Sequence, residues 1–259
     1  MQSTASSAAR DASFDMAEVR ICAIVPVFNH AATLPATLAG VGRAGLPCFV
    51  VDDGSEASQA AAIDRAASAA GATLLRMDRN GGKGAAVKFA LRRAALDGFT
   101  HALQIDADGQ HELADVERFV AAARARPDAI VIGVAQLGDD VPGVRRVARH
   151  LTHVWVWINT LSFDIADSMC GFRIYPLAAV SDLLDATGDR MEFDVEILVR
   201  AHWRRTPFVS VPTRVHYPAG GVSHFRVVRD NALISAMHAR LFFGMLRRLP
   251  HWVWRRAHR

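Results

Sequence analysis

The sequence predicts an α/β fold in which a mostly parallel, Rossmann-like β-sheet is flanked by helices. Short apolar runs typical of buried strands alternate with helix-forming segments through the first half of the chain. Several runs end at acidic or glycine-rich segments, at the edge where parallel sheets bind ligands. The 259 residues, 51% hydrophobic and 22% charged, suffice for one large domain or two small ones and exclude wholesale disorder.

The individual elements follow from the residue pattern in chain order. A strand is predicted where an apolar run stops at Pro, Gly or Asp, and a helix where Ala-rich or periodic sequence is bounded by Gly or Pro. The predicted strands are residues 20–27, 48–51, 73–77, 101–105, 129–134 and 208–215. The predicted helices are residues 31–41, 56–70, 84–97, 112–126, 144–161 and 227–246. No internal repeat or long linker separates independent domains.

The predicted helix 144–161 carries an apolar stripe whose members recur at steps of three and four residues. The simplest expectation is that this stripe packs on the sheet, while Trp155 and Trp157 leave a lipid-facing role open. The stripe consists of Val144, Val147, Leu151, Val154, Ile158 and Leu161. No apolar run approaches the ~18–20 residues that span a bilayer.

The net charge of +4 is unevenly distributed along the chain. Residues 225–259 hold eight arginines and one aspartate, a net charge of +7 that leaves −3 for the remainder. Such a basic pole predicts an anionic partner surface, either membrane phospholipid or nucleic acid. Residues 1–18 read as a loose tail without a secretory signal, and three scattered cysteines indicate neither a disulfide framework nor a zinc site. A cytoplasmic location is the simplest expectation.

Two carboxylates, Asp106 and Asp108, follow the predicted strand 101–105. At this spacing they can share Mg²⁺ or Mn²⁺ with the phosphates of a ligand, and Gln110 offers one more oxygen. The cation would neutralise charge on a departing diphosphate. The alternative is a solvated turn.

Two further strand ends carry polar chemistry. Asp52 and Asp53 can accept hydrogen bonds from a base or a ribose, or can form an Asx turn with Ser55 as helix N-cap. Residues 80–84, N-G-G-K-G, allow close backbone approach to an anion at a helix start, and Lys83 adds charge. This segment is not a P-loop, because that motif needs Gly at position 78 and Ser or Thr at position 84.

Four segments in this order resemble the family 2 glycosyltransferases, which have the GT-A fold. They are V-P-V-F-N (25–29), V-D-D-G-S (51–55), N-G-G-K-G-A-A (80–86) and D-A-D-G-Q-H (106–111). The resemblance is closest to the dolichol-phosphate mannose synthase and polyprenyl-phosphate glycosyltransferase branch. It implies a UDP- or GDP-linked sugar donor and Mg²⁺ or Mn²⁺. The implied donor-binding residues are Pro26, Phe28, Asn29, Asp52, Asp53, Lys83, Gly84, Asp106, Ala107 and Asp108, and the implied metal ligands are Asp106, Asp108 and Gln110.

Three downstream segments resemble the same family more thinly. They are D-S-M-C-G-F-R (167–173), F-D-V-E (193–196) and G-V-S-H (221–224). The resemblance implies that Arg173 binds a phosphate and that Asp194 or Glu196 acts as general base or positions the acceptor. It implies acceptor-side roles for Asp167, Ser223 and His224. The alternatives are a surface arginine, carboxylates that cap a helix, and a plain turn.

The chain departs from the family pattern in two places. His30 stands where the family often has Glu, which puts one ribose contact in doubt. The Q-x-x-R-W segment of processive polysaccharide synthases is absent, so processive synthesis is not expected.

The predicted function is a metal-dependent, inverting sugar transfer to a lipid-linked acceptor. A polyprenyl phosphate is already anionic and needs no base, whereas a hydroxyl needs Asp194 or Glu196. The predicted organisation is a tail (1–18), a GT-A domain (19–225) and a basic amphipathic C-terminal helix and tail (226–259). The last segment is expected to contact the anionic inner face of the cytoplasmic membrane, and no nucleic acid is expected. The alternatives are a non-catalytic nucleotide-sugar-binding subunit and a sugar nucleotidyltransferase.

Overall fold

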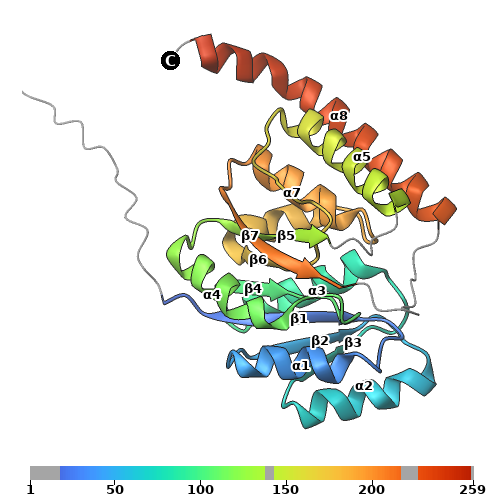
Figure 1. The fold of residues 1–259 in the computed structure, drawn as a ribbon. Coiled ribbons are helices and arrows are strands. Elements are labelled where there is room, and N and C mark those ends of the chain that lie inside the picture. Colours follow the sequence, from blue (N-terminus) through green and yellow to red (C-terminus); the bar gives the residue numbers. More distant parts are fainter. Residues whose placement is uncertain (1–17, 138–142, 217–226, 258–259) are drawn as a thin grey trace, which may run out of the picture.

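The computed structural model describes residues 18–137, 143–216 and 227–257, and these build a seven-stranded sheet with helices on both faces (Figure 1). The strand order is β3-β2-β1-β4-β6-β5-β7, and β6 alone among them runs antiparallel to its neighbours. The strands are β1 Ile21–Val27, β2 Cys48–Asp52, β3 Thr73–Arg76, β4 His101–Gln104, β5 Ile130–Leu137, β6 Arg173–Pro176 and β7 Phe208–Val215. The predicted fold class is confirmed.

The helices divide between the two faces of the sheet. Alternate residues of β1 enter different cores, because successive side chains of a strand point to opposite faces. One core contains residues of α1, α2 and α4, and the other contains residues of α3, α7 and α8. The helices are α1 Leu34–Arg43, α2 Ala57–Ala69, α3 Lys83–Leu96, α4 Val116–Ala125, α5 Gly143–Thr160, α6 Leu177–Val180, α7 Phe193–Trp203 and α8 Val227–Ala257.

Strand β6 was not among the predicted strands. It has four residues, R-I-Y-P, and begins with an arginine, so neither an apolar run nor an alternating pattern marks it. It is nevertheless fully buried between β4 and β5, and its first residue, Arg173, pairs with Gln104 at the end of β4.

Helix α5 corrects the expectation that its apolar stripe packs on the sheet. Val147, Leu151 and Ile158 are exposed, whereas Val156, Asn159 and Thr160 are buried. The reason is that α5 packs against α7 and α8. The side of α5 opposite the apolar stripe binds Asp167, in the loop that follows the helix, through Arg149 and His153.

Helix α8 is longer than predicted, with 31 residues in place of about 20, and it includes part of the basic C-terminal segment. It docks on the domain through Met237, Leu241 and Met245, which are buried. Arg248 lies 4.8 Å from the centroid of the Trp203 ring, a cation–π contact that joins α8 to α7. Within the described residues, no helix has the length and apolar character to cross a bilayer.

The contact between α5 and α8 contains a buried histidine, His238, whose charge state makes stability depend on pH. Burial lowers the pKa of His238 from 6.5 to about 4. Its Nδ1 pairs with Asn159 Nδ2 at 3.3 Å, and its buried Nε2 has no hydrogen-bond partner. Between pH 6.5 and pH 4 the unfolded chain binds a proton at this residue that the folded chain excludes.

Stability is therefore expected to fall by about 2 kcal/mol between pH 7 and pH 5 through this residue. Urea unfolding at the two pH values measures the loss. The variant His238→Gln, which keeps a polar side chain but does not titrate, should show a smaller loss. An equal loss in both proteins would contradict this assignment.

Candidate active site

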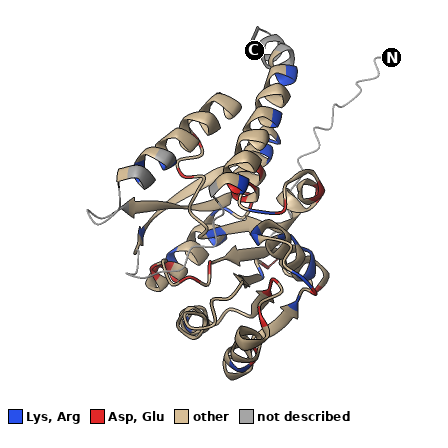
Figure 2. Cartoon of the chain, turned by 90° about the vertical axis from the view of Figure 1, so that its right-hand side faces the viewer, with Lys and Arg blue, Asp and Glu red and all other residues tan. Residues whose placement is uncertain are grey.

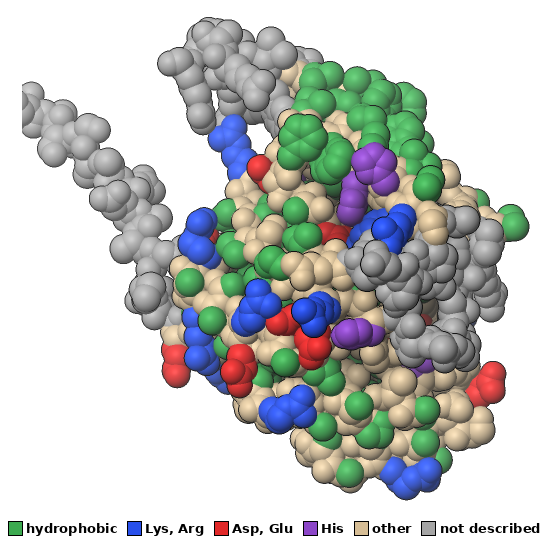
Figure 3. Space-filling view, in the orientation of Figure 1, with side chains coloured by type: hydrophobic (Ala, Val, Ile, Leu, Met, Phe, Trp, Pro, Cys, Tyr) green, Lys and Arg blue, Asp and Glu red, His purple; other side chains and the backbone are tan. Residues whose placement is uncertain are grey.

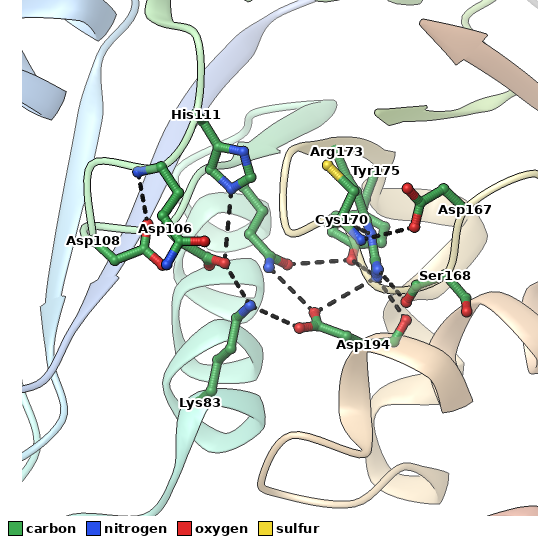
Figure 4. A network of polar contacts seen from close by, with 12 residues as sticks. Lys83, Asp106, Asp108, His111, Asp167, Ser168, Cys170, Arg173, Tyr175 and Asp194 are labelled. Atoms are coloured by element: carbon green, nitrogen blue, oxygen red, sulfur yellow. Dashed lines mark hydrogen bonds and ion pairs between the residues drawn. The ribbon is translucent and has the colours of Figure 1, made fainter. Parts of the chain in front are cut away.

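The site is assembled from the loops that follow β1, β2, β3 and β4 at their carboxyl ends, together with the start of α7. In Figure 4, Lys83 from the start of α3, Asp106 from the loop after β4 and Asp194 from α7 point toward one another, and Asp108 lies beside Asp106 in the same loop. These four residues frame the site. The sequence predicted the meeting of Lys83, Asp106 and Asp108 at one edge of the sheet. Asp194 comes from a helix more than 80 residues further along the chain.

The two acids after β2 hold neighbouring loops in place. Asp53 accepts hydrogen bonds from the backbone N–H groups of Gly81 and Gly82, at 2.7 and 2.9 Å, and from Asn80 at 3.0 Å. Gly82 has φ = 103°, a backbone conformation that L side chains rarely adopt. Burial raises the pKa of Asp53, and the two N–H groups oppose that rise. Asp53 thus fixes the glycine-rich segment that was predicted to face phosphate.

Asp52 has both carboxylate oxygens engaged. One accepts the N–H of Ser55 at 2.9 Å, which is the predicted Asx turn, and the other accepts from Nε of Arg76 at 3.0 Å. The N-cap of α2 is Glu56 and not Ser55 as predicted. The loop after β1 joins this arrangement through Asn29, whose N–H donates to Ser55 Oγ and whose Oδ1 accepts the N–H of Glu56 at the start of α2. Pro26 lies near the end of β1, and Phe28 follows it.

Lys83 stands between two carboxylates. Its Nζ lies 2.8 Å from Asp106 Oδ2 and 2.7 Å from Asp194 Oδ2, and all three side chains are largely buried. Burial opposes ionisation of Asp106, but the charges of Lys83 and His111 outweigh it and hold the pKa of Asp106 below its usual range. The pKa of Lys83 is likewise raised above its usual range by the two carboxylates, against the effect of burial. The charged forms of Lys83 and Asp106 are therefore favoured.

Asp106 and Asp108 have features that suit a divalent cation. Asp106 Oδ1 is buried and accepts no hydrogen bond, so it has a free lone pair inside the site. The pKa of Asp108 is raised by burial and by the nearby Asp106 carboxylate, and a cation would relieve that repulsion. The described residues contain no group of three or more His, Cys, Asp or Glu side chains arranged to hold a metal. The chain would thus supply two carboxylates, and ligand phosphate and water would complete the coordination.

Arg173 is fully buried beneath the site. Its guanidinium donates to the carbonyl oxygens of Ser168 and Cys170, each at 2.7 Å, and of Asp194 at 2.6 Å. In this arrangement its donors hold the segment 168–170 against the start of α7. This geometry favours a positioning role for Arg173 over direct binding of a phosphate.

Two residues that the sequence analysis did not single out complete this buried network. Gln104 donates to Asp194 Oδ1 at 3.3 Å and accepts from the hydroxyl of Tyr175 at 3.2 Å. The available signal was a glutamine inside the apolar strand H-A-L-Q-I, where a polar side chain requires a buried partner.

Asp167 anchors the loop that precedes β6. Its carboxylate binds Arg149 and His153 of α5 and accepts the backbone N–H groups of Ala135, Met169 and Cys170. Further along the loop, a Cβ at Gly171 would collide with the Asp106 carboxylate, so only glycine allows this close approach. The predicted acceptor-side segment therefore lies directly against the two-carboxylate motif.

Glu196 lies apart from the other predicted catalytic residues. Its carboxylate is fully buried, pairs with Arg200 at 2.7 Å and Arg240 at 3.2 Å, and accepts the N–H of Gly188. It joins α7 to α8 and is not placed to accept a proton beside Lys83. Ser223 and His224 lie outside the described residues.

Gly84, Ala107 and Gln110 shape the surrounding loops. A side chain at Gly84 would collide with Phe193 and the backbone at Asp189, so the first turn of α3 sits close to the start of α7. The carbonyl of Ala107 accepts the hydroxyl of Thr33. The N–H of Gln110 donates to Asp108 Oδ1 at 3.0 Å, which orients that carboxylate.

Comparison with solved structures shows the same fold in glucosyl-3-phosphoglycerate synthase from Mycobacterium tuberculosis. Its complex with Mn²⁺ and UDP-glucose matches with a TM-score of 0.63 and 17% identity, covering 90% of this chain and 79% of that one. Its complex with Mn²⁺, UDP and phosphoglyceric acid matches with a TM-score of 0.66 and 14% identity, covering 88% and 79%. These neighbours do not bear out the narrower resemblance to the dolichol-phosphate mannose synthase branch.

Comparison at the sequence level identifies the family. Two uncharacterized proteins of Methanocaldococcus jannaschii are similar: MJ0544 is 25% identical over 181 residues, covering 66% of this chain and 77% of that protein, and MJ1222 is 26% identical over 206 residues, covering 76% and 82%. The model of "Glycosyl transferase family 2" matches residues 22–181, which is more than half of the chain and includes the loops after β1 to β4. The chain therefore belongs to glycosyl transferase family 2 and is a glycosyltransferase.

Proposed function

We propose that this enzyme transfers a sugar from a nucleotide diphosphate sugar to a polyprenyl phosphate, with a divalent cation held by Asp106 and Asp108. The observation that carries the proposal is the placement of the unpartnered oxygen of Asp106 opposite Lys83, at the edge of the sheet. Mn²⁺ and UDP-glucose bind the M. tuberculosis synthase, whose fold is similar, and this supports the choice of donor and metal.

The donor residues act by position and charge. The loops on the nucleoside side include Phe28 and are held in place by the hydrogen bonds of Asn29, Asp52 and Asp53. Lys83 supplies a positive charge for the diphosphate. The cation, when bound, neutralises negative charge on the departing diphosphate. The acceptor oxygen attacks the sugar from the face opposite the diphosphate, which inverts the configuration at that carbon.

The surroundings of Asp194 guide the choice of acceptor. Its Oδ2 contacts the ammonium of Lys83 at 2.7 Å, and its Oδ1 contacts Gln104 at 3.3 Å and the guanidinium of Arg173 at 3.5 Å, so both carboxylate oxygens are already engaged and neither is turned toward an acceptor hydroxyl. An acceptor hydroxyl needs a base, whereas a phosphate oxygen is already anionic. A polyprenyl phosphate therefore suits this site better than a hydroxyl acceptor, and we place the enzyme at the inner face of the cytoplasmic membrane.

The proposal is tested with labelled UDP- and GDP-sugars offered to three acceptors: polyprenyl phosphate, phosphoglyceric acid and an alkyl glycoside. We expect a Mn²⁺- or Mg²⁺-dependent glycolipid from the first acceptor, and none from Asp108→Asn. Transfer only to a hydroxyl acceptor would contradict the acceptor assignment. Nucleotide-sugar binding without transfer to any acceptor would favour a binding subunit and contradict the proposed activity.

A further inference from the structure

The outward side of α5 carries a row of exposed apolar side chains, which we call the α5 apolar face: Val147, Leu151, Trp155 and Ile158. Val147 is 70% exposed and Leu151 57%, although residues spaced in this way on a helix usually face a core. Figure 3 shows hydrophobic side chains gathered over α5 and the adjoining part of α8. An exposed patch of this kind in a soluble-type fold marks a binding surface.

The α5 apolar face continues onto α8 and beyond the end of α5. The ring of Trp155 contacts that of Phe242, with centroids 6.4 Å apart, and Phe242 contacts the exposed Phe243 at 6.0 Å. At the other end, Leu161 and Phe163 are also exposed. The exposed apolar side chains thus extend from Val147 to Phe163 and, through Phe242, onto Phe243 of α8, so they form a patch and are not isolated exposed residues.

The charged residues of α5 and α8 are almost all basic. Residues 143–163 contain three arginines, two histidines and no acidic residue. Helix α8 contains six arginines and a single acid, Asp230, which is buried. Figure 2 shows basic positions recurring along the helix that ends at the C-terminus. Among them Arg247 and Arg248 are exposed, beside Leu246.

This charge pattern selects among the possible occupants of the face. A second copy of the chain, packed face to face, would bring arginine-rich surfaces together, which is unfavourable. An anionic bilayer offers both partners at once, with headgroups for the arginines and acyl chains for the apolar residues, while tryptophan favours the boundary between them.

We infer that the α5 apolar face, with the adjoining side of α8, docks on an anionic lipid bilayer. The sequence predicted that the C-terminal basic segment contacts the membrane. Because Arg248 of that segment stacks on Trp203 of the domain, we assign the main membrane contact to α5. The inference rests on the proposed function in one respect: docking would help catalysis only if the acceptor is lipid-linked and is presented at the same membrane surface.

The position of α5 relative to the site suits this arrangement. Arg149 and His153, on the inward side of α5, bind Asp167, which anchors the loop that reaches Asp106 through Gly171. The helix that would lie on lipid is therefore bound directly to the acceptor-side loop of the site.

The test is co-sedimentation of the full chain with phosphatidylcholine vesicles, with and without phosphatidylglycerol. We expect binding that requires phosphatidylglycerol and falls roughly tenfold in Leu151→Glu, because the substitution places a like-charged carboxylate in the apolar contact. The matched control is Leu96→Glu, at an exposed apolar position (84%) at the end of α3, and it should bind vesicles as the wild type does.

Three results bear on the inference separately from the proposed activity. Unchanged vesicle binding by Leu151→Glu would overturn it. A second contrary result would be a wild-type protein that does not bind vesicles but forms a dimer in solution, with Leu151→Glu a monomer. The α5 apolar face would then bind a second copy of the chain. Binding of UDP or GDP with Mn²⁺, measured by calorimetry, should be equal in the wild type and both variants. If the wild type bound neither nucleotide, the proposed function would be contradicted, while the vesicle-binding result would be unaffected.

Discussion

The variant Asp106→Asn is expected to lower kcat/KM for sugar transfer by about a thousandfold. Asparagine is nearly isosteric but lacks the charge that Asp106 keeps through its contacts with Lys83 and His111. It also replaces the buried oxygen that accepts no hydrogen bond, which is the oxygen we assign to the metal. Initial rates with donor and polyprenyl phosphate measure the first effect, and Mn²⁺ binding followed by electron paramagnetic resonance measures the second.

A surface aspartate provides the matched control for this variant. Asp97 follows α3 and pairs with Arg93 four residues before it, far from the carboxyl edge of the sheet. Asp97→Asn should leave both the transfer rate and Mn²⁺ binding unchanged. If Asp106→Asn retained activity within a few-fold of the wild type, the assignment of the metal to this carboxylate would be wrong.

The variant Lys83→Met is expected to change metal binding and transfer in opposite directions. Without the ammonium, Asp106 no longer shares its charge with an internal cation, so Mn²⁺ should bind about tenfold more tightly in the absence of nucleotide. Transfer should nevertheless fall about a hundredfold, because the diphosphate loses a positive partner. Free-metal titration and steady-state kinetics on the same preparation separate the two effects.

The same variant should lose about 3 kcal/mol of stability, since two largely buried carboxylates remain without their shared cation. The double variant Lys83→Met/Asp194→Asn removes one of those charges and should regain part of the loss without regaining transfer. Unchanged or weaker binding of free Mn²⁺ by Lys83→Met would show that Lys83 does not compete with the metal for Asp106.

The parts of the site that follow single strands were accessible from the sequence. An acidic or glycine-rich segment after an apolar run is local information, and it placed Asp53, Lys83 and Asp106 at one edge correctly. The direction in which a side chain faces is not local information. Arg173 follows a plausible phosphate-binding pattern, yet it lies under the site, because the antiparallel strand that it begins is covered by α7.

Helix α5 shows the same limit for surfaces. A periodic apolar stripe indicates that one side of a helix differs from the other, but it does not indicate which side the protein covers. Here the polar side is the covered one, because Arg149 and His153 meet the buried carboxylate of Asp167, a partner that lies in a loop without regular pattern. That pairing depends on tertiary structure and has no signature in the spacing of residues.

The reversal of β6 has a consequence for how this enzyme divides its tasks. In a sheet whose strands all run one way, each loop at the carboxyl edge leaves a strand and leads into a helix. Because β6 runs the other way, the segment before it arrives at that edge instead, and Arg173 enters the sheet beside Gln104. Under the proposed function, donor recognition and acceptor recognition would therefore lie in stretches of chain with different connections. On that assignment, the incoming segment could change in sequence and length to suit another acceptor while the four outgoing loops kept the same donor.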